Sequence, residues 1–215
     1  MNTSTIKKNT GLFNIGHNVE YFHKDNQGNI KKMFVENRLG DLILKWFRQY
    51  NPTPIWENGH VKDGVINHFS AYGIRIPFIT GTWSNSRKIH NLVTNAGQAG
   101  VASRINGSGG EAAFTFIAMG TGVTAADVAN TTLQTELAAS GLSRVAASAS
   151  RTTTDVTNDT AQLTTTFSVT GSVAVTESGV LNAASVGTLL ARQVFSAVNV
   201  INGDSLQIVW AFDVD

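Results

Sequence analysis

The chain has 215 residues, of which 42% are hydrophobic and only 14% are charged, and its formal net charge is +1. This length can bury a substantial core, while the charged content lies well under the roughly 25% that is usual for a soluble globular domain. The absence of cysteine excludes disulfides and cysteine-ligated zinc, and no segment has the apolar length of a signal peptide or a membrane span, so we expect a soluble protein made in a cytoplasm.

Charge is distributed unevenly along the sequence. Up to residue 111 there are 13 Lys or Arg against 7 Asp or Glu, a net of +6 (13 − 7), and from residue 112 on there are 3 against 8, a net of −5 (3 − 8). Such a shift indicates a domain boundary, and the glycine-rich segment 107–110 (GSGG) has the composition of a flexible spacer. We therefore predict a basic N-terminal attachment region at 1–106 and a second domain at 111–215.

The N-terminal region is predicted to hold a β-hairpin, a further strand and two helices. The hairpin has a glycine-containing loop between its strands, and the first helix stops before Pro52 and Pro54. The hairpin strands are expected at 19–24 and 30–35, the helices at 40–48 and 96–105, and the further strand at 89–93. This combination indicates a small α+β unit.

The second domain has the pattern of an antiparallel β-sandwich. Short runs rich in β-branched and aromatic residues recur at roughly ten-residue spacing and are separated by glycine-containing turns. The expected strands are 113–119, 162–169, 172–177, 189–195 and 205–214, the last with Leu206, Ile208 and Trp210 on one face. A short helix is predicted at 132–138, after a possible N-cap at Thr124.

One loop has the placement of a phosphate-binding loop. Residues 119–124 (MGTGVT) follow a predicted strand and precede a predicted helix. They lack the third glycine of a dinucleotide fingerprint and the Gly-Lys-Ser/Thr ending of a P-loop, and no lysine lies nearby. We interpret the segment as a plain turn and expect no cofactor.

The histidines do not form a metal-binding pattern. All five, His17, His23, His60, His68 and His90, lie in the basic half, and no two have the i, i+4 spacing that places ligands on one helix face. His60 and Asp63 could share a loop, which leaves a metal site there as an alternative. Structural histidines are the simpler interpretation, and we assign no metal ligand.

The acidic residues do not predict a catalytic centre. The segment 176–179 (TESG) is not the Gly-x-Ser-x-Gly elbow of a serine hydrolase, and its half of the chain has no histidine. Glycoside hydrolysis needs two carboxylates facing each other in a cleft, whereas the acids of the second half, including Glu177 and Asp204, have the spacing of solvated turn residues. We expect a protein that is not an enzyme.

Basic and aromatic residues alternate loosely in the first half. The basic residues are Lys31, Lys32, Arg38, Lys45, Arg48, Arg75, Arg87 and Lys88. This is the loose signature of nucleic-acid contact, although no stretch forms a dense cluster. Docking on an acidic protein partner is at least as consistent with the pattern.

Several blocks of the sequence occur in a defined order over residues 89–215. The blocks are 90–97 (HNLVTNAG), 114–125 (FTFIAMGTGVTA), 132–137 (TLQTEL), Arg144, 172–183 (SVAVTESGVLNA), 187–192 (GTLLAR) and 202–210 (NGDSLQIVW). In this order they resemble a group of tailed-bacteriophage structural proteins that are variously labelled tail fibre, tail or head-decoration proteins. The resemblance implies that 175–182 form a strand and turn. Glu177 and Arg192 lie on neighbouring predicted strands, where we expect a cross-strand pair of modest effect.

Together, these observations predict a mainly β protein with a C-terminal immunoglobulin-like antiparallel β-sandwich and a smaller N-terminal α+β attachment region. The resemblance implies a non-enzymatic component of a tailed-phage particle, either a head-decoration or a neck or tail protein. Its expected partners are other virion proteins (capsid, portal-neck or tail) and copies of itself, without membrane or nucleic acid. The alternatives are a receptor-binding tail appendage that recognises a host glycan or protein, and a glycan-active enzyme.

Overall fold

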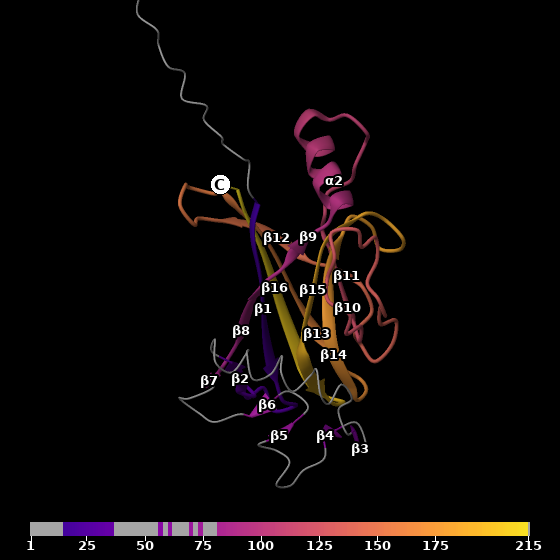
Figure 1. Cartoon of the computed structure of the whole chain (residues 1–215). Coiled ribbons are helices and arrows are strands. Elements are labelled where there is room, and N and C mark those ends of the chain that lie inside the picture. The colour runs from indigo at the N-terminus through magenta and orange to yellow at the C-terminus, as the bar shows by residue number, and fades with distance from the viewer. Residues whose placement is uncertain are drawn as a thin grey trace, which may run out of the picture.

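Two antiparallel sheets of five strands each make up most of the described structure (Figure 1). The computed structural model describes residues 15–36, 56–57, 60–61, 69–70, 73–74 and 81–214. The first sheet has the order β12-β13-β16-β1-β8. Its strands are β12 (Ser148–Thr152), β13 (Thr160–Ser168), β16 (Ser205–Val214), β1 (Ile15–Lys24) and β8 (Arg87–His90).

The second sheet has the order β11-β10-β14-β15-β9. Its strands are β11 (Val145–Ala146), β10 (Phe116–Gly120), β14 (Val173–Leu181), β15 (Leu189–Val200) and β9 (Leu92–Val93). The chain passes between the sheets after β8, so β8 and β9 lie at the edges of different sheets.

The alternation of β16 orients the first sheet. Leu206, Ile208, Trp210 and Phe212 are buried while the residues between them are partly exposed, as the sequence predicted. The middle strands of the second sheet are instead buried over nearly continuous runs, because other parts of the chain also cover their outer face. The alternation therefore gives β16 one inward-facing apolar row.

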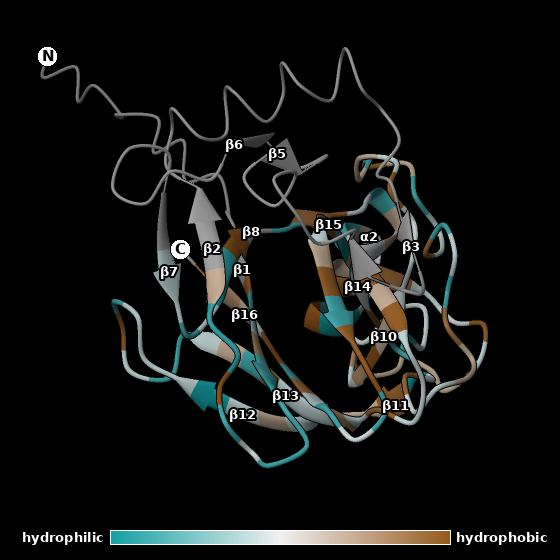
Figure 2. Ribbon diagram, turned by 90° about the horizontal axis from the view of Figure 1, so that it is seen from below, coloured by the Kyte–Doolittle hydropathy of each residue, from teal (hydrophilic) through white to brown (hydrophobic). Residues whose placement is uncertain are grey.

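The core lies between the two sheets. Figure 2 shows the strands of the two sheets facing each other, as in a β-sandwich. Tyr21 on β1 packs on Phe195 of β15, with ring centroids 4.8 Å apart. The indole Nε1 of Trp210 donates across the core to Ser178 Oγ at 3.2 Å, so this large side chain is buried without leaving its polar atom unpaired.

The predicted hairpin is present in part. Its first strand belongs to β1, and Asp25 closes the loop by accepting the backbone N–H groups of Gln27 and Asn29. After one bridge between Lys24 and Ile30 the strands diverge, because β2 (Met33–Glu36) pairs with β7 (Gly81–Ser84). Two further short pairs are β3 (Trp56–Glu57) with β4 (His60–Val61) and β5 (Phe69–Ser70) with β6 (Gly73–Ile74).

Helix α2 (Asn95–Asn106) confirms the prediction for 96–105. Thr94 caps its N-terminus by accepting the N–H of Gly97, and Gly107 ends it with φ 70°, a left-handed conformation that glycine adopts without steric cost. A Cβ at Gly97 would lie 2.2 Å from the carbonyl oxygen of Leu190, so glycine lets the helix approach β15. The segment 107–110 thus ends a helix that is docked on the sheet.

The predicted helix at 132–138 is wrong. Residues 121–144 run as an extended loop along the second sheet, with an isolated bridge between Gly120 and Glu136. Leu133 is buried, and Leu137 donates its N–H to the carbonyl of Met119. These tertiary contacts outweigh a weak helical pattern whose apolar stripe is incomplete. The helix predicted at 40–48 lies outside the described residues.

The sandwich takes strands from both sides of the glycine-rich segment. All ten residues of β1 pair with β16, which places β1 between β16 and β8, and β9 pairs with β15. Because β1 lies in the interior of the first sheet, this sheet is not confined to the predicted second domain at 111–215. Residues 15–24 and 87–93 therefore belong to the two sheets, although the sequence analysis assigned them to a separate attachment region.

We predict that the fragment 107–215 does not form the sandwich. Without β1, the backbone groups of β16 that pair with β1 have no partner, and the core loses Val19 and Tyr21. Trp210 is the only tryptophan of this fragment, so its fluorescence will report a water-exposed indole instead of the buried one of the intact fold. The fragment 15–215, which keeps every described strand, is the control and should retain the far-UV circular dichroism of the full chain. A buried Trp210 in the fragment 107–215 would contradict this prediction.

Candidate functional site

A buried carboxylate, Glu177 of β14, is enclosed by backbone N–H groups. Its Oε1 accepts the N–H groups of Gly122 at 2.9 Å and Thr135 at 2.7 Å, and its Oε2 accepts that of Gln134 at 3.0 Å. The residue is 0% exposed. Three amide donors satisfy much of the hydrogen-bonding capacity that the carboxylate loses when it leaves water.

Arg192 supplies the opposite charge. Its Nε and Nη2 lie 2.8 Å and 2.7 Å from Glu177 Oε2, and the side chain is 2% exposed. The remaining guanidinium donors reach Asn130 Oδ1 at 2.9 Å and the carbonyl of Thr124 at 3.1 Å. The predicted pair therefore exists, but it is a fully buried network and not the modest surface pair that the sequence indicated.

The candidate phosphate loop belongs to this network. Gly122 directs its N–H at the Glu177 carboxylate, and Thr176 Oγ1 donates to the Gly122 carbonyl. A Cβ at Gly120 or Gly122 would lie 2.5 Å from Glu177 Oε1, so both positions require glycine for close approach. The anion that this glycine-rich loop holds is a side chain of the protein itself.

The interpretation of Glu177 and Asp204 as solvated turn residues is wrong. Asp204 does lie in the turn before β16, but it is only 2% exposed. It accepts His23 at 2.7 Å, Lys31 Nζ at 2.9 and 3.1 Å, and the N–H of Ile201 at 3.0 Å. Sequence spacing did not reveal this burial, because the side chains that contact Asp204, those of His23 and Lys31, lie more than 170 positions earlier in the chain.

This second network, which we call the Asp204 clasp (His23, Lys31 and Asp204), has a defined charge state. Burial raises the pKa of Asp204, but the hydrogen bonds from Lys31, His23 and Ile201 outweigh burial and hold that pKa below its usual 3.8. Burial lowers the pKa of His23 below 6.5, against the opposing effect of its hydrogen bond to Asp204. Near neutral pH the imidazole is therefore neutral, with its Nε2 proton donated to an ionised Asp204.

The other histidines give no metal site within the part of the chain that is described. In those residues no three His, Cys, Asp or Glu side chains come together as metal ligands. His17, His60 and His90 lie on β1, β4 and β8, while His68 and Asp63 lie outside the described residues, so the alternative site at His60 and Asp63 stays a prediction.

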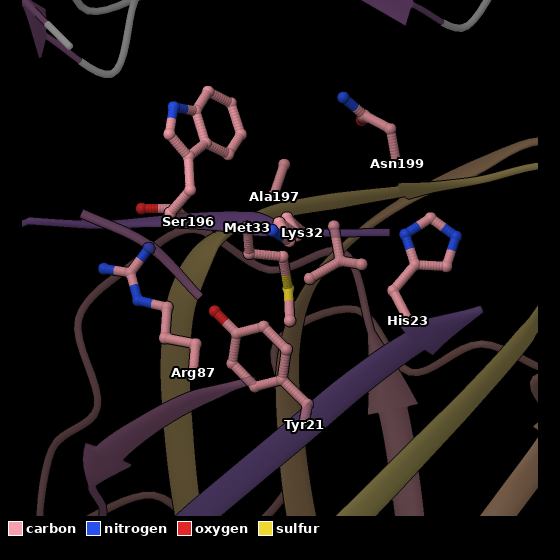
Figure 3. A pocket seen from close by; sticks show the side chains of 10 residues that line it. Tyr21, His23, Lys32, Met33, Arg87, Ser196, Ala197 and Asn199 are labelled. Carbon is pink, nitrogen blue, oxygen red and sulfur yellow. The ribbon is translucent and has the colours of Figure 1, made fainter. Parts of the chain in front are cut away.

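A polar pocket of about 130 Å³ opens beside the clasp, between the β8 edge of the first sheet and β15 (Figure 3). Arg87 pairs directly with Tyr21 on the neighbouring strand, so the two side chains leave the same face of the sheet. The residues that line the pocket come from β1, the segment after it, β2, β7, β8 and β15. They are Tyr21, His23, Lys32, Met33, Trp83, Arg87, Ser196, Ala197, Val198 and Asn199.

A β-bulge in β15 shapes one wall of this pocket. Val175 pairs with Val198 but Glu177 pairs with Val194, so three residues of β15 stand opposite Thr176 alone. Such an irregularity bends a strand and changes the direction of its side chains. The three residues opposite Thr176 end at Ala197, and Ser196 and Ala197 both line the pocket.

An apolar hollow of about 340 Å³ lies near α2. Its lining includes Val101 and Arg104 of the helix, Phe114, and Leu163 and Phe212 of the first sheet. Helix α2 covers only part of the core between the two sheets, so apolar side chains of the core line the hollow. It offers few groups with which to orient a ligand.

Half of the basic residues singled out in the sequence lie within the described residues. Lys31 is held in the Asp204 clasp, Lys32 and Arg87 line the polar pocket, and Lys88 is exposed on β8. Arg38, Lys45, Arg48 and Arg75 lie outside the described residues. Tyr21, Ser196 and Asn199 also line the pocket, although no sequence motif marks them.

Comparison with known proteins gave no relative: no protein-family model, no curated protein and no solved structure matches the chain. Within the described residues, no helix has the length and apolar character needed to cross a membrane.

We predict that breaking the Glu177–Arg192 pair is severely destabilising. Glu177→Gln leaves the Arg192 guanidinium buried without its counter-charge, which costs about 3–5 kcal/mol in the free energy of unfolding. The matched control is Glu136→Gln, which breaks the pair with Arg144 at a carboxylate that is 29% exposed and so partly screened by water, and it should cost clearly less. Urea denaturation of both variants measures the two costs, and equal losses would contradict the prediction.

We also predict a pH-dependent stability from His23. Because its folded-state pKa lies below 6.5, the unfolded chain binds this proton first as the pH falls, and stability decreases from about pH 6.5 downward. The Asp204 contribution is present above pH 3.8 and is lost at lower pH, as the pH falls through its depressed folded-state pKa.

The test compares His23→Gln with the unaltered chain by urea denaturation between pH 7 and pH 5, a window chosen around the ordinary histidine pKa of about 6.5. The free energy of unfolding should fall less steeply in the variant. The four other histidines are present in both proteins, so their contributions cancel. Identical pH slopes would show that His23 does not carry this dependence.

Proposed function

We propose that this protein is a non-enzymatic structural component of a tailed-phage particle, serving as a head-decoration or a neck or tail protein. Its localisation would be the virion, after synthesis in the host cytoplasm. Its partners would be capsid, portal-neck or tail proteins and further copies of the same chain.

The observation that carries this proposal is the position of the resembling sequence blocks in the fold. Residues 114–125, 132–137, 172–183 and 187–192 meet at the buried Glu177–Arg192 network, which joins β14, β15 and the loop 121–144. The blocks that carry the resemblance to phage structural proteins are thus the ones that meet at this buried network. Such shared features support a common scaffold, and fold-level likeness alone argues less for function than a site does.

The use of the buried acids supports a non-enzymatic role. Glu177 and Asp204 are the acids whose replacement would test a glycan-active enzyme, and both have their oxygens engaged by internal donors. A general acid or nucleophile must instead present a carboxylate to substrate in a cleft. Loss of a glycan-cleaving activity in Glu177→Gln without loss of fold would favour the enzyme alternative.

The same proposal includes the class of the β-sandwich, the region that docks on the particle and the edges at which copies could pair. We propose an immunoglobulin-like class for the sandwich, based on two face-to-face antiparallel sheets and the buried Trp210 between them. Docking on the particle is proposed for the basic N-terminal region, because complementary charge steers association with acidic partners. The strands β11 and β12, rich in small residues, end each sheet at an edge where copies could pair.

The copy number of the chain in purified phage particles tests the proposal. Quantitative mass spectrometry against the major capsid protein should find the chain at a fixed ratio. Near parity or a large fraction identifies a head-decoration protein, while roughly six or twelve copies identify a neck or tail component of the corresponding rotational symmetry. Absence of the chain from washed particles that infect normally would overturn the proposal.

A further inference from the structure

The apolar hollow near α2 is an open end of the core. Ala149 pairs with Leu163 and Ala161 with Phe212, so both alanines lie in the inward-facing rows of the first sheet. Leu163 and Phe212 are buried, but the two alanines are exposed, and Val214 at the end of β16 is 45% exposed. All five residues line the hollow. This end of the sandwich therefore presents inward-facing apolar surface that a ligand could remove from water.

Helix α2 and the segment after it form the other wall of the hollow. Val101 and Arg104 are three positions apart, so they lie on one face of the helix, and both line the hollow. The ring of Phe114 packs against the helix, because a Cβ at Gly100 would lie 2.6 Å from the ring. This wall is therefore built from groups that are already in contact with one another.

Arg104 is the only charged residue among those that line the hollow. Its Nη1 donates to the carbonyl of Glu111 at 3.2 Å, which holds one side of the guanidinium in place. The described structure pairs the other guanidinium donors with no carboxylate. A cation in the last turn stabilises a helix by itself. At the hollow, however, the same group can also bind an anionic oxygen pair through parallel N–H···O bonds.

The rest of the lining restricts the chemistry of the ligand. No Asp or Glu occurs in it, and its uncharged polar residues are Thr115, Ser150 and Gln162. The volume of about 340 Å³ lies at the lower end of the roughly 300–1,000 Å³ of small-molecule pockets. A sugar or nucleotide would bury many polar groups here and leave most of them without partners, which is costly. A flexible apolar body with one anionic end matches the lining instead.

We propose that the hollow binds a single-chain fatty acid, with its alkyl chain against Phe114, Leu163 and Phe212 and its carboxylate at Arg104. The bound chain would cover the exposed alanines of β12 and β13 and so complete the core at this end of the sandwich. The inference goes beyond the virion role and does not depend on it, because it concerns a ligand of the isolated chain.

Ligand-detected NMR titration of the full chain tests this proposal with four probes, each kept below the concentration at which it forms micelles. Hexanoate, octanoate and decanoate differ only in chain length, and 1-octanol has the chain of octanoate without its charge. Affinity should rise about fourfold per methylene from hexanoate to octanoate, the increment for burying one CH₂ group, and further or to a plateau at decanoate, where the hollow is filled. Octanoate should bind about tenfold more tightly than 1-octanol.

Variants then locate the binding. Arg104→Gln should weaken binding of octanoate about three- to tenfold and leave 1-octanol unchanged, a difference that a role in helix stability alone would not produce. Its control is Lys88→Gln, which removes one positive charge at the opposite edge of the first sheet. Ala161→Phe fills the hollow and should abolish binding, while Thr166→Phe places the same ring on the outer face of β13 and should not. Near-UV circular dichroism verifies that each variant is folded.

Several outcomes would overturn the proposal. Absence of binding by octanoate and decanoate would show that the hollow does not take a fatty acid, and affinities that do not change with chain length would show that it does not enclose the alkyl chain. Full binding by Ala161→Phe would place the ligand elsewhere. Binding of the chain to phosphatidylglycerol vesicles, lost in Arg104→Gln and without binding of free octanoate, would assign the hollow to membrane lipid.

Discussion

The second sheet depends on one buried carboxylate. Glu177 accepts hydrogen bonds from three backbone N–H groups of the loop 121–144, and Arg192 balances its charge from the next strand. A buried ion pair is seldom more stabilising than an apolar pair of equal volume, but it allows few alternative arrangements of its partners. The network therefore explains why residues 121–144 follow one path along β10 and β14, and why glycine is required at positions 120 and 122.

The Asp204 clasp is a second buried polar network, and it joins segments from opposite ends of the described sequence. It ties the turn before β16 to β1 and to Lys31, which anchors the first described strand beside the last. Contacts of this sequence separation carry a large loop-closure cost, so they form only when the pairing of β1 with β16 repays it. The basic N-terminal sequence is thus partly structural, since Lys31 neutralises a buried acid.

Local pattern predicted the strands well and their partners poorly. The alternation of 205–214 and the turn residues around 202–204 sufficed to find β16 and its inward face. Helix α2, which begins after Thr94 and ends before Gly107, was also predicted. The sequence could not show that 19–24 lies beside 205–214, because register between distant strands leaves no local signal. For the same reason the composition shift at residue 111 resembled a domain boundary, although strands from both sides share each sheet.

The polar pocket is a consequence of the same long-range pairing. Tyr21 and Arg87 come together only because β1 lies between β16 and β8, and Ser196 enters the pocket because β15 bulges opposite Thr176. The clasp fixes His23 at one side and the ring of Tyr21 rests on Phe195, so these parts of the lining are held by buried contacts. The same framework that makes the sandwich stable therefore also holds these residues in place at the edge of the first sheet, beside β15.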